Sequence, residues 1–382
     1  MKFTINRLSF MQQINNVQRA IPGKTTINIL YGIKLTADSN GLTLIGSDAD
    51  ISIESRILSN DPLADLQIKN HGQIILPARL LNEIVKKLPT DLVDVEVNDQ
   101  FIATIISGSA EFQITGIDGN EYPRLPEIDL DHQIQLPTLT FKNMINQTIF
   151  ATSNQESRPI LTGLHLVLKE DHLVGVATDS HRLSQREIPL KLSQISNDFE
   201  AITIPKKTMN ELVRIVPDDA ELFMTLSNQQ IIFTYETLTI YSRLLEGNYP
   251  ATERLIPTES ETQLVLNAND FLQAIERASL MSHEGKNNIV ELDINAEKVE
   301  LSVRGNEIGN VAEEIQFESV NGQPLQISFN PDYMKEALRS FGDIDITIQF
   351  NSSVRPMLLT PNQTSELPHN ELLQLLTPVR TH

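Results

Sequence analysis

One pattern recurs three times along the 382 residues of this chain. Each copy opens with a short strand-like run that leads into a helical pattern, at residues 1–21, 136–153 and 264–282. Each copy then has a strand end, a proline and a second amphipathic helix, and the prolines lie 128 and 126 residues apart, at Pro77, Pro205 and Pro331. Self-similarity at a fixed period is typical of tandem structural units. The sequence therefore predicts three domains of one fold.

The second helix of each copy follows directly from its proline. Proline suits a first helical turn because it lacks an N–H that would be unpaired there. In the first copy apolar residues then follow at helical spacing, at Leu80, Leu81, Ile84, Val85 and Leu88. A third landmark, a tyrosine–proline turn, closes the first two copies at Tyr122 and Tyr249 and is missing from the third.

Short runs of alternating apolar and polar residues fill the space between these landmarks, as at Val93, Val95 and Val97. This period of two is typical of antiparallel strands. We expect each copy to be an α+β unit of two helices and about six to eight strands, with one sheet face packed on the helices. The expected domains are residues 1–128, 129–258 and 259–382. Chance similarity of spacing in a different α+β protein is the alternative.

The formal net charge of −20 by itself argues against a nucleic-acid partner, because phosphate affinity depends on lysine and arginine. The positive charge is concentrated, however, in the helical segments. Residues 2–24 hold four basic and no acidic residues, and the six helical segments with their flanks carry +8 against −28 elsewhere. If these helices share one surface, that surface could lie along DNA phosphates without reading bases. Ordinary solvated helix faces are the alternative.

Enzyme motifs are missing from the sequence. It contains no phosphate-binding loop, no dinucleotide fingerprint, no H-E-x-x-H zinc motif and no nucleophile elbow. The eight histidines lack metal-ligand spacing, and the absence of cysteine excludes disulfides and thiol chemistry. We therefore predict no catalytic residue, no metal and no cofactor.

Two polar groupings resemble sites more closely. Asp48 and Asp50 could hold a divalent ion, although turn capping is the commoner role of such aspartates. Asp179, Ser180 and His181 stand in a row, but adjacent strand residues point to opposite faces and do not converge as catalytic groups must.

Membrane segments are not expected either. No apolar run approaches the roughly 18 residues that span a bilayer. The N-terminus reads as a strand entering a helix and not as a signal peptide. We expect a cytoplasmic protein with no membrane partner.

The block ATDSHRLSQREIPL, residues 177–190, resembles the T-D-G-H-R-L segment of the bacterial sliding clamp family, the β subunit of DNA polymerase III. Three more blocks resemble the same family in the same order: NILYGIKLTADSNGLTLIGSDADISIE, SRPILTGLHL and EGNYPATERLIP. The resemblance covers essentially the whole chain. It implies a DNA clamp fold of three tandem domains and a non-catalytic processivity factor for DNA replication.

The resemblance also implies partners. Members of the family form head-to-tail homodimers whose ring encircles double-stranded DNA without sequence specificity. They bind the DNA polymerase III α subunit, the clamp loader and other proteins that carry a short clamp-binding motif. A heterologous interface that closes produces a ring, and joining edge strands across it removes an aggregation hazard. By similarity the dimer interface comprises Phe112, Ile114, Leu280 and Met281, with Glu313 and Glu314 nearby; intradomain core is the alternative for the four apolar residues.

Two further sets of residues are implied by similarity. The partner-peptide pocket, which needs an apolar floor and a few donors at its rim, comprises Leu161, Thr178, His181, Arg182, Leu183, Pro250, Arg254, Leu255, Asn330, Tyr333, Pro356, Leu376, Pro378, Val379 and Arg380. The DNA-facing set comprises Lys24, Arg79, Gln155, Arg158, Lys206 and Lys207. Ser180 replaces the glycine common in the family block, and Thr381 and His382 extend the tail, which leaves the local turn and the pocket edge open.

Two rival functions come from other classes. A hydrolase would use Asp179 and His181, and a monomeric three-domain adhesion or scaffold protein would have no DNA partner. Loss of turnover in a His181→Ala variant would favour the hydrolase. A particle of one chain mass would favour the scaffold.

Overall fold

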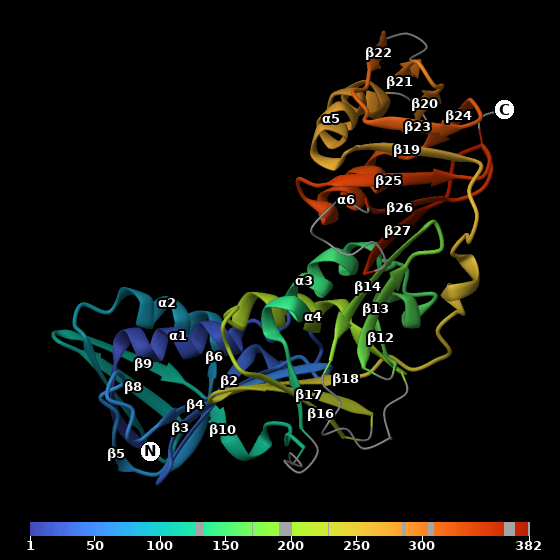
Figure 1. The fold of residues 1–382 in the computed structure, drawn as a ribbon. Helices are drawn as coiled ribbons and strands as arrows, with labels where there is room; N and C mark the ends of the chain where they lie inside the picture. The colour runs from blue at the N-terminus through green and yellow to red at the C-terminus, as the bar shows by residue number, and fades with distance from the viewer. Residues whose placement is uncertain are drawn as a thin grey trace. The chain divides into compact units, whose positions relative to one another are not determined.

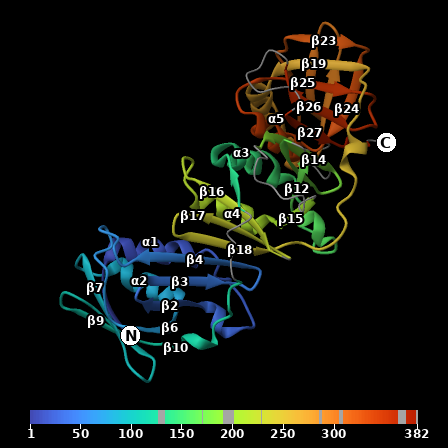
Figure 2. The same ribbon diagram turned by 60° about the horizontal axis from the view of Figure 1, so that its bottom comes forward.

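The structure is a computed structural model that describes residues 1–126, 133–169, 171–190, 201–227, 229–284, 288–304, 309–362 and 371–380 (Figures 1 and 2). It divides into two compact units. The first unit contains Met1–Thr138 and Asn210–Leu244, and the second contains most of residues 139–209 and the chain from Leu245 onward. The expected junction between the first two domains, at residues 128 and 129, lies outside the described residues.

The first repeat has two helices on one side and a succession of strands. Its elements are β1 (Lys2–Asn6), α1 (Arg7–Gln18), η1 (Asn28–Tyr31), β2 (Gly32–Asp38), β3 (Gly41–Ser47), β4 (Ile51–Leu58), β5 (Gln67–Asn70), β6 (Gly72–Pro77), α2 (Ala78–Lys87), β7 (Leu92–Val97), β8 (Ile102–Ser107), β9 (Ala110–Thr115), β10 (Ile117–Asp118) and η2 (Gly119–Glu121).

Helix α1 begins at Arg7 because Asn6 caps it: the Asn6 side-chain oxygen accepts the main-chain N–H groups of Leu8 and Ser9. One face of α1 is buried through Phe10, Ile14 and Val17, at the spacing of an amphipathic helix. This face lies so close to β3 that a Cβ at Gly46 would meet the Val17 carbonyl oxygen at 2.1 Å. Only glycine fits there.

The second repeat supplies strands to both units. Its elements are β11 (Ile134–Leu136), α3 (Thr138–Thr148), η4 (Ile149–Ala151), η5 (Pro159–Thr162), β12 (Gly163–Lys169), β13 (His172–Thr178), β14 (Arg182–Pro189), β15 (Ala201–Pro205), α4 (Lys206–Ile215), β16 (Leu222–Ser227), β17 (Gln230–Tyr235), β18 (Leu238–Arg243) and η6 (Thr252–Leu255). In the first unit β18 pairs antiparallel with β4, with Ile240 opposite Ile53.

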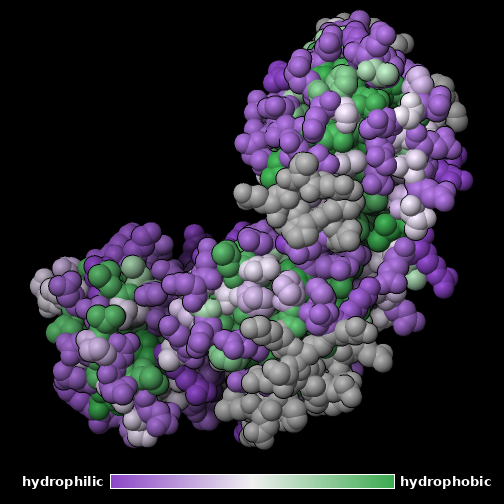
Figure 3. All heavy atoms as spheres, viewed as in Figure 1, coloured by the Kyte–Doolittle hydropathy of each residue, from purple (hydrophilic) through white to green (hydrophobic). Residues whose placement is uncertain are grey.

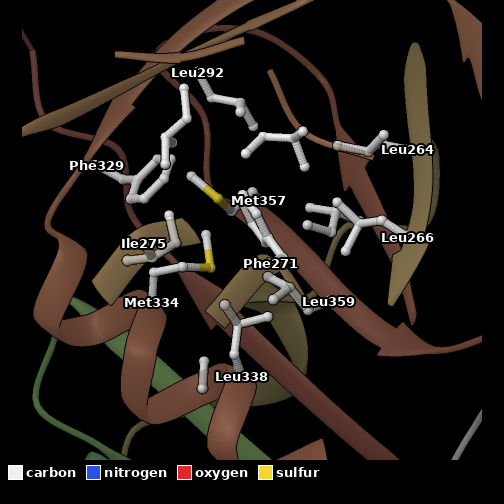
Figure 4. Close-up of a cluster of buried hydrophobic side chains, with 14 of the residues drawn as sticks. Leu264, Leu266, Phe271, Ile275, Leu292, Phe329, Met334, Leu338, Met357 and Leu359 are labelled. Carbon is white, nitrogen blue, oxygen red and sulfur yellow. The ribbon is translucent and has the colours of Figure 1, made fainter. Parts of the chain in front are cut away.

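The third repeat lies wholly in the second unit. Its elements are β19 (Thr262–Asn267), α5 (Ala268–Glu284), β20 (Val290–Ile294), β21 (Val299–Arg304), β22 (Asn310–Glu314), β23 (Ser319–Gly322), β24 (Leu325–Phe329), α6 (Pro331–Phe341), β25 (Asp345–Phe350), β26 (Met357–Pro361) and β27 (Leu372–Leu376). In its core, helices α5 and α6 pack on strand side chains (Figure 4). Phe271, Ile275, Met334 and Leu338 meet Leu264, Leu266, Leu292, Phe329, Met357 and Leu359 there.

The strands of the described residues form four antiparallel sheets, and two of these sheets run across a junction between repeats. The strand order of the first nine-stranded sheet is β10-β6-β2-β3-β4-β18-β17-β16-β11. The second has the order β15-β12-β13-β14-β27-β26-β25-β19-β23. The remaining sheets have the orders β5-β1-β7-β8-β9 and β22-β21-β20-β24, so that β5 and β9 are the end strands of one and β22 and β24 those of the other. The prediction of three tandem α+β domains with antiparallel sheets is confirmed.

Two details of the prediction are wrong. The described residues contain ten strands in the first repeat and nine in the third, more than six to eight, because β5, β10 and β23 are only two to four residues long and show no alternation. The prediction that the prolines lie in a first helical turn is wrong for Pro77 and Pro205, which end β6 and β15 and precede their helices. Pro331 lies in the first turn of α6, which the Asn330 side chain caps.

The surface in view is mostly hydrophilic, with small scattered hydrophobic areas (Figure 3). Within the described part of the chain, no helix has both the length and the apolar character needed to cross a membrane.

Candidate partner-binding site and DNA-facing surface

Arg182, the first residue of β14, joins the second repeat to the third. Its Nε donates to Asp179 Oδ2 at 3.0 Å and its Nη2 donates to the Phe150 carbonyl oxygen at 2.8 Å. Its Nη1 donates to the Glu336 carboxylate on α6. The guanidinium lies over the rings of Tyr333, at 4.5 Å, and Phe150, at 5.5 Å. Every nitrogen of this nearly buried side chain therefore has a partner within the second unit.

The turn before Arg182 excludes the catalytic reading of Asp179, Ser180 and His181. Asp179 Oδ1 accepts the main-chain N–H groups of His181 and Arg182, at 2.9 and 3.1 Å. The His181 ring stacks near Tyr333, with ring centroids 6.4 Å apart. Ser180 has a φ of +79°, a conformation that favours glycine and explains the glycine of the family block. The carboxylate shapes a turn and does not activate a nucleophile.

Asp48 has the same role in the first repeat. Its Oδ1 accepts the main-chain N–H groups of Asp50 and Ile51, at 2.9 and 2.8 Å. The expected turn-capping role is confirmed.

The predicted pocket floor is buried. Leu161, Thr178, Leu183 and Leu376 are each at most 5% exposed. Leu183 lies opposite Leu375 in the β14–β27 pair and belongs to a small apolar cluster that Val174, Val176, Leu358 and Leu375 complete. A ligand would therefore contact mainly the more exposed residues that surround this floor.

The tail after β27 is anchored to both repeats. The Thr377 main-chain N–H donates to the His181 carbonyl oxygen at 2.9 Å, and the Val379 N–H donates to the Ser328 carbonyl oxygen at 2.7 Å. These contacts bring Pro378 and Val379 close to the His181 turn and to β24, which leads to Asn330 and Tyr333. Thr381 and His382 lie outside the described residues.

The remaining predicted pocket residues are Pro250 before η6, Arg254 and Leu255 in η6, Pro356 in the turn before β26, and Arg380 in the tail after β27. Pro250, Arg254 and Arg380 are exposed. Leu255, which is 54% exposed, and Pro356 line one cavity. Sequence reasoning missed Phe150 and Glu336, which hold Arg182 in place. No local signal marks them, because they lie 32 and 154 residues from Arg182.

A half-buried histidine supports the same sheet. The His165 ring stacks on the Tyr249 ring, with centroids 4.0 Å apart and planes at 1°. Its Nδ1 is 2.9 Å from the Thr203 hydroxyl. Burial lowers the pKa of His165 to about 4, against a smaller opposing effect of a main-chain contact at Ile202. The imidazole is therefore neutral near pH 7.

The predicted DNA-facing residues lie on both units. Lys24 and Arg79 are exposed on the first unit, and Gln155, Arg158 and Lys207 are exposed on the second. Lys206 is half-buried, and burial, followed by the nearby Arg182, lowers its pKa. The Arg158 Nη1 donates weakly to the Ser180 hydroxyl at 3.4 Å.

Helices α5 and α6 carry ion pairs instead of free cations. Arg339 pairs with Glu276 at 2.7 Å and Lys335 pairs with Asp332 at 2.8 Å. Arg277 pairs with Glu313 on β22. The sequence of this helix pair is nearly neutral, and its basic side chains are also paired with nearby carboxylates.

Two of the predicted dimer residues lie on the end strand β9 and two lie on helix α5. Phe112 and Ile114 are on β9, 38% and 3% exposed. Leu280 on α5 is 70% exposed, and Met281 packs partly against the core of the third repeat.

Comparison with known proteins places this architecture in a class. Family models match three successive stretches: the N-terminal domain of the DNA polymerase III beta subunit at residues 1–126, its central domain at 135–251 and its C-terminal domain at 253–373. The three-domain repeat with its continuous antiparallel sheets is that of a DNA sliding clamp.

Relatives match over their full length. The chain is 42% identical to the beta sliding clamp of Bacillus subtilis, and 41% identical to that of Streptococcus pneumoniae serotype 4, with at least 99% of both chains covered. The crystal structure of the Bacillus subtilis clamp superposes with a TM-score of 0.95 at 41% identity, covering 100% of both chains. The Thermotoga maritima beta subunit shares the fold, with a TM-score of 0.87 at 21% identity.

The chain belongs to the family of bacterial DNA polymerase III beta subunits, the β sliding clamps. It is a non-catalytic processivity factor of DNA replication, and the family implies DNA and a DNA polymerase as its partners.

Proposed function

We propose that the chain acts as a head-to-tail homodimer that closes a ring around duplex DNA and tethers polymerases through the pocket beside Arg182. The grip on DNA is then topological, and no reaction is catalysed. The domains proposed for this ring are residues 1–128, 129–258 and 259–382.

The observation that carries the proposal is the sheet order. Strand pairs β4–β18 and β14–β27 continue a sheet across the two junctions within the chain. The end strands β9 and β22 each have one open edge, β9 in the five-stranded sheet and β22 in the four-stranded sheet. An open edge is an aggregation hazard unless it is covered or paired. Pairing β9 of one subunit with β22 of another would repeat the internal junctions and close the assembly.

Side chains on β9 and on α5, the helix that contacts β22, support the pairing. Leu280 and Phe112 are large apolar residues that are strongly or partly exposed, and burial of such side chains is favourable by about 25 cal/mol per Å² of apolar area. Ile114 and Met281 then form the floor of the contact, because they already pack into the domain cores. Glu313 is held by Arg277 of the same chain and leaves Glu314 for a contact across the interface.

The proposed DNA contacts are few and unspecific. Lys24, Arg79, Gln155, Arg158, Lys206 and Lys207 would touch phosphates without reading bases. The acidic remainder of the chain would repel DNA elsewhere.

The proposed peptide pocket takes the motif of the polymerase α subunit, the clamp loader and related partners. Tyr333, His181 and Leu255 offer partly exposed rings and an apolar side chain, and the tail residues Pro378 and Val379 add apolar surface. Such groups suit a leucine or aromatic anchor.

Sedimentation equilibrium tests the dimer. We expect a particle of twice the 42.9 kDa chain mass. A Leu280→Glu variant should shift the particle towards the chain mass, whereas Leu8→Glu, at another exposed leucine of a helix, should leave the dimer intact. A wild-type particle of a single chain mass would refute the proposal.

A further inference from the structure

A cavity of about 700 Å³ lies in the second unit beside the proposed peptide pocket. Its walls are residues 255–261, between η6 and β19, and the turn from β25 to β26, at Asn351, Ser352, Arg355 and Pro356. Its volume is in the range of ligand-binding pockets. Most of its lining lies outside the residues assigned above to the motif pocket.

We propose that this cavity binds an extended stretch of the partner's chain that flanks the clamp motif and carries a lysine or arginine. The inference rests on the proposed function of the motif pocket. It adds a second contact that selects among partners by the residues outside their motif.

Continuity with the motif pocket identifies the occupant. Leu255 and Pro356 line the cavity and belong also to the proposed pocket. Leu255 is 54% exposed, and Pro356, in the turn of the other wall, is partly exposed. A chain that leaves the motif pocket past Leu255 therefore enters the cavity between two apolar side chains.

The main chain of one wall is open to a peptide. Glu261 is fixed by its N–H, which donates to the Phe350 carbonyl oxygen at 2.9 Å. Thr258, Glu259 and Ser260 make no main-chain hydrogen bond to another residue in the described ranges. Unpaired main-chain groups beside a cavity are those that an extended peptide uses in strand-like recognition.

Charge selects a basic occupant. Neither Glu259 nor Glu261 forms an ion pair with any residue that the structure describes, and Arg355 is the cationic residue of the lining. The neighbouring Glu253, by contrast, is already paired with Lys169 at 2.6 Å. The cavity lining thus has a formal charge of −1, with two carboxylates in the wall formed by residues 255–261. A lysine or arginine complements it, and nucleic acid does not.

Fluorescence anisotropy with the full-length protein tests the proposal. The probes are a synthetic peptide with the clamp motif of a polymerase α subunit, and the same peptide extended by two lysines or by two glutamates, at either end. We expect the lysine extension at one end to tighten binding by about threefold to tenfold. The glutamate extension at that end should weaken binding, and the gain from lysine should shrink with added salt.

The double variant Glu259→Gln/Glu261→Gln should lose the lysine gain and bind the unextended peptide as the wild type does. Glu297→Gln, at an exposed turn of the third repeat, is the matched control and should retain the gain.

Three results separate the two proposals. Equal affinity for the unextended and both lysine-extended peptides, or a gain that persists in the double variant, would overturn the cavity site alone. If the unextended peptide does not bind but a lysine-extended one binds with dependence on Glu259 and Glu261, the cavity site stands without the motif pocket. Binding of none of the peptides would overturn both.

Discussion

Arg182 and Glu336 form an ion pair that joins the start of β14 to helix α6. A similar pair joins the first two repeats, where Arg19 Nη1 lies 3.1 Å from Glu211 Oε2 on α4. Each junction within the chain therefore combines a strand pair with an arginine–glutamate contact. The Arg182 pair also keeps the guanidinium over the Tyr333 ring, at the rim of the proposed pocket.

Removing this pair should loosen the junction. We expect Glu336→Ala to lower the free energy of unfolding by about 1–2 kcal/mol, because Arg182 is nearly buried and keeps only Asp179 as its carboxylate partner. Urea denaturation measures the change. The control Glu297→Ala removes an exposed carboxylate and should stay within about 0.5 kcal/mol of the wild type. Equal stability of the two variants would mean that the pair contributes nothing.

The backbone at Ser180 predicts a different substitution pattern. Ser180 has a φ of +79°, which glycine adopts without strain, so Ser180→Gly should keep or slightly raise the melting temperature. Ser180→Val should lower the free energy of unfolding by about 1–2 kcal/mol, because a β-branched residue is strained at positive φ. Thermal unfolding followed by circular dichroism compares the two. A valine variant as stable as the glycine variant would contradict the assigned conformation.

His165 predicts a loss of stability in acid. Its pKa in the folded chain is about 4, below the ordinary value of 6.5. As pH falls, the unfolded chain therefore binds the proton before the folded chain does. The contribution of neutral His165 to the free energy of unfolding is fully present above pH 6.5 and is lost as pH falls towards 4. The full shift corresponds to about 3.4 kcal/mol, and the partial exposure of the ring reduces the expected loss to about 2 kcal/mol. His165→Phe, which keeps a ring against Tyr249, should flatten stability in this pH range, while His71→Gln, at an exposed histidine, should not. An unchanged slope in His165→Phe would refute the assignment.

Leu255 provides a test of the pocket that leaves the core intact. The side chain is 54% exposed, so Leu255→Ala should change stability little and weaken a polymerase motif peptide by about tenfold. Isothermal titration with the full-length protein measures the affinity. Leu63→Ala, at a 79% exposed leucine of the first repeat, should bind the peptide normally. Leu183→Ala is less informative, because Leu183 is buried and its truncation also costs stability.

Much of the fold could be predicted from the sequence because local patterns of apolar and turn residues determine its helices and strands. The strand-to-helix entries at Lys2–Gln18 and Thr262–Glu284 were predicted from periodicity and turn residues alone. The pairing of β14 with β27 could not be predicted in this way, because the partners Arg182 and Leu376 are 194 residues apart in the sequence. Strand pairing at such a distance depends on tertiary packing.

The candidate site was harder to predict from the sequence than the fold. The T-D-S-H-R block pointed to Arg182, but the residues that hold the guanidinium come from η4, from the Asp179 turn and from α6. A sequence pattern also cannot distinguish a pocket floor from a core, and Leu161, Leu183 and Leu376 prove to be buried. The cavity between Leu255 and Pro356 has no sequence motif, because its walls are an irregular segment and a turn.

The central claim is that the grip on DNA is topological, and retention on circular against linear DNA tests it most directly. The full-length protein, loaded by a clamp loader onto a nicked circular plasmid, would be passed through a gel-filtration column in about 1 M salt, where the Debye length is about 3 Å and phosphate contacts are screened. We predict that the protein elutes with the circle and is released once a restriction enzyme cuts it. Equal retention on the circle and the linear form, or loss from both, would contradict the account.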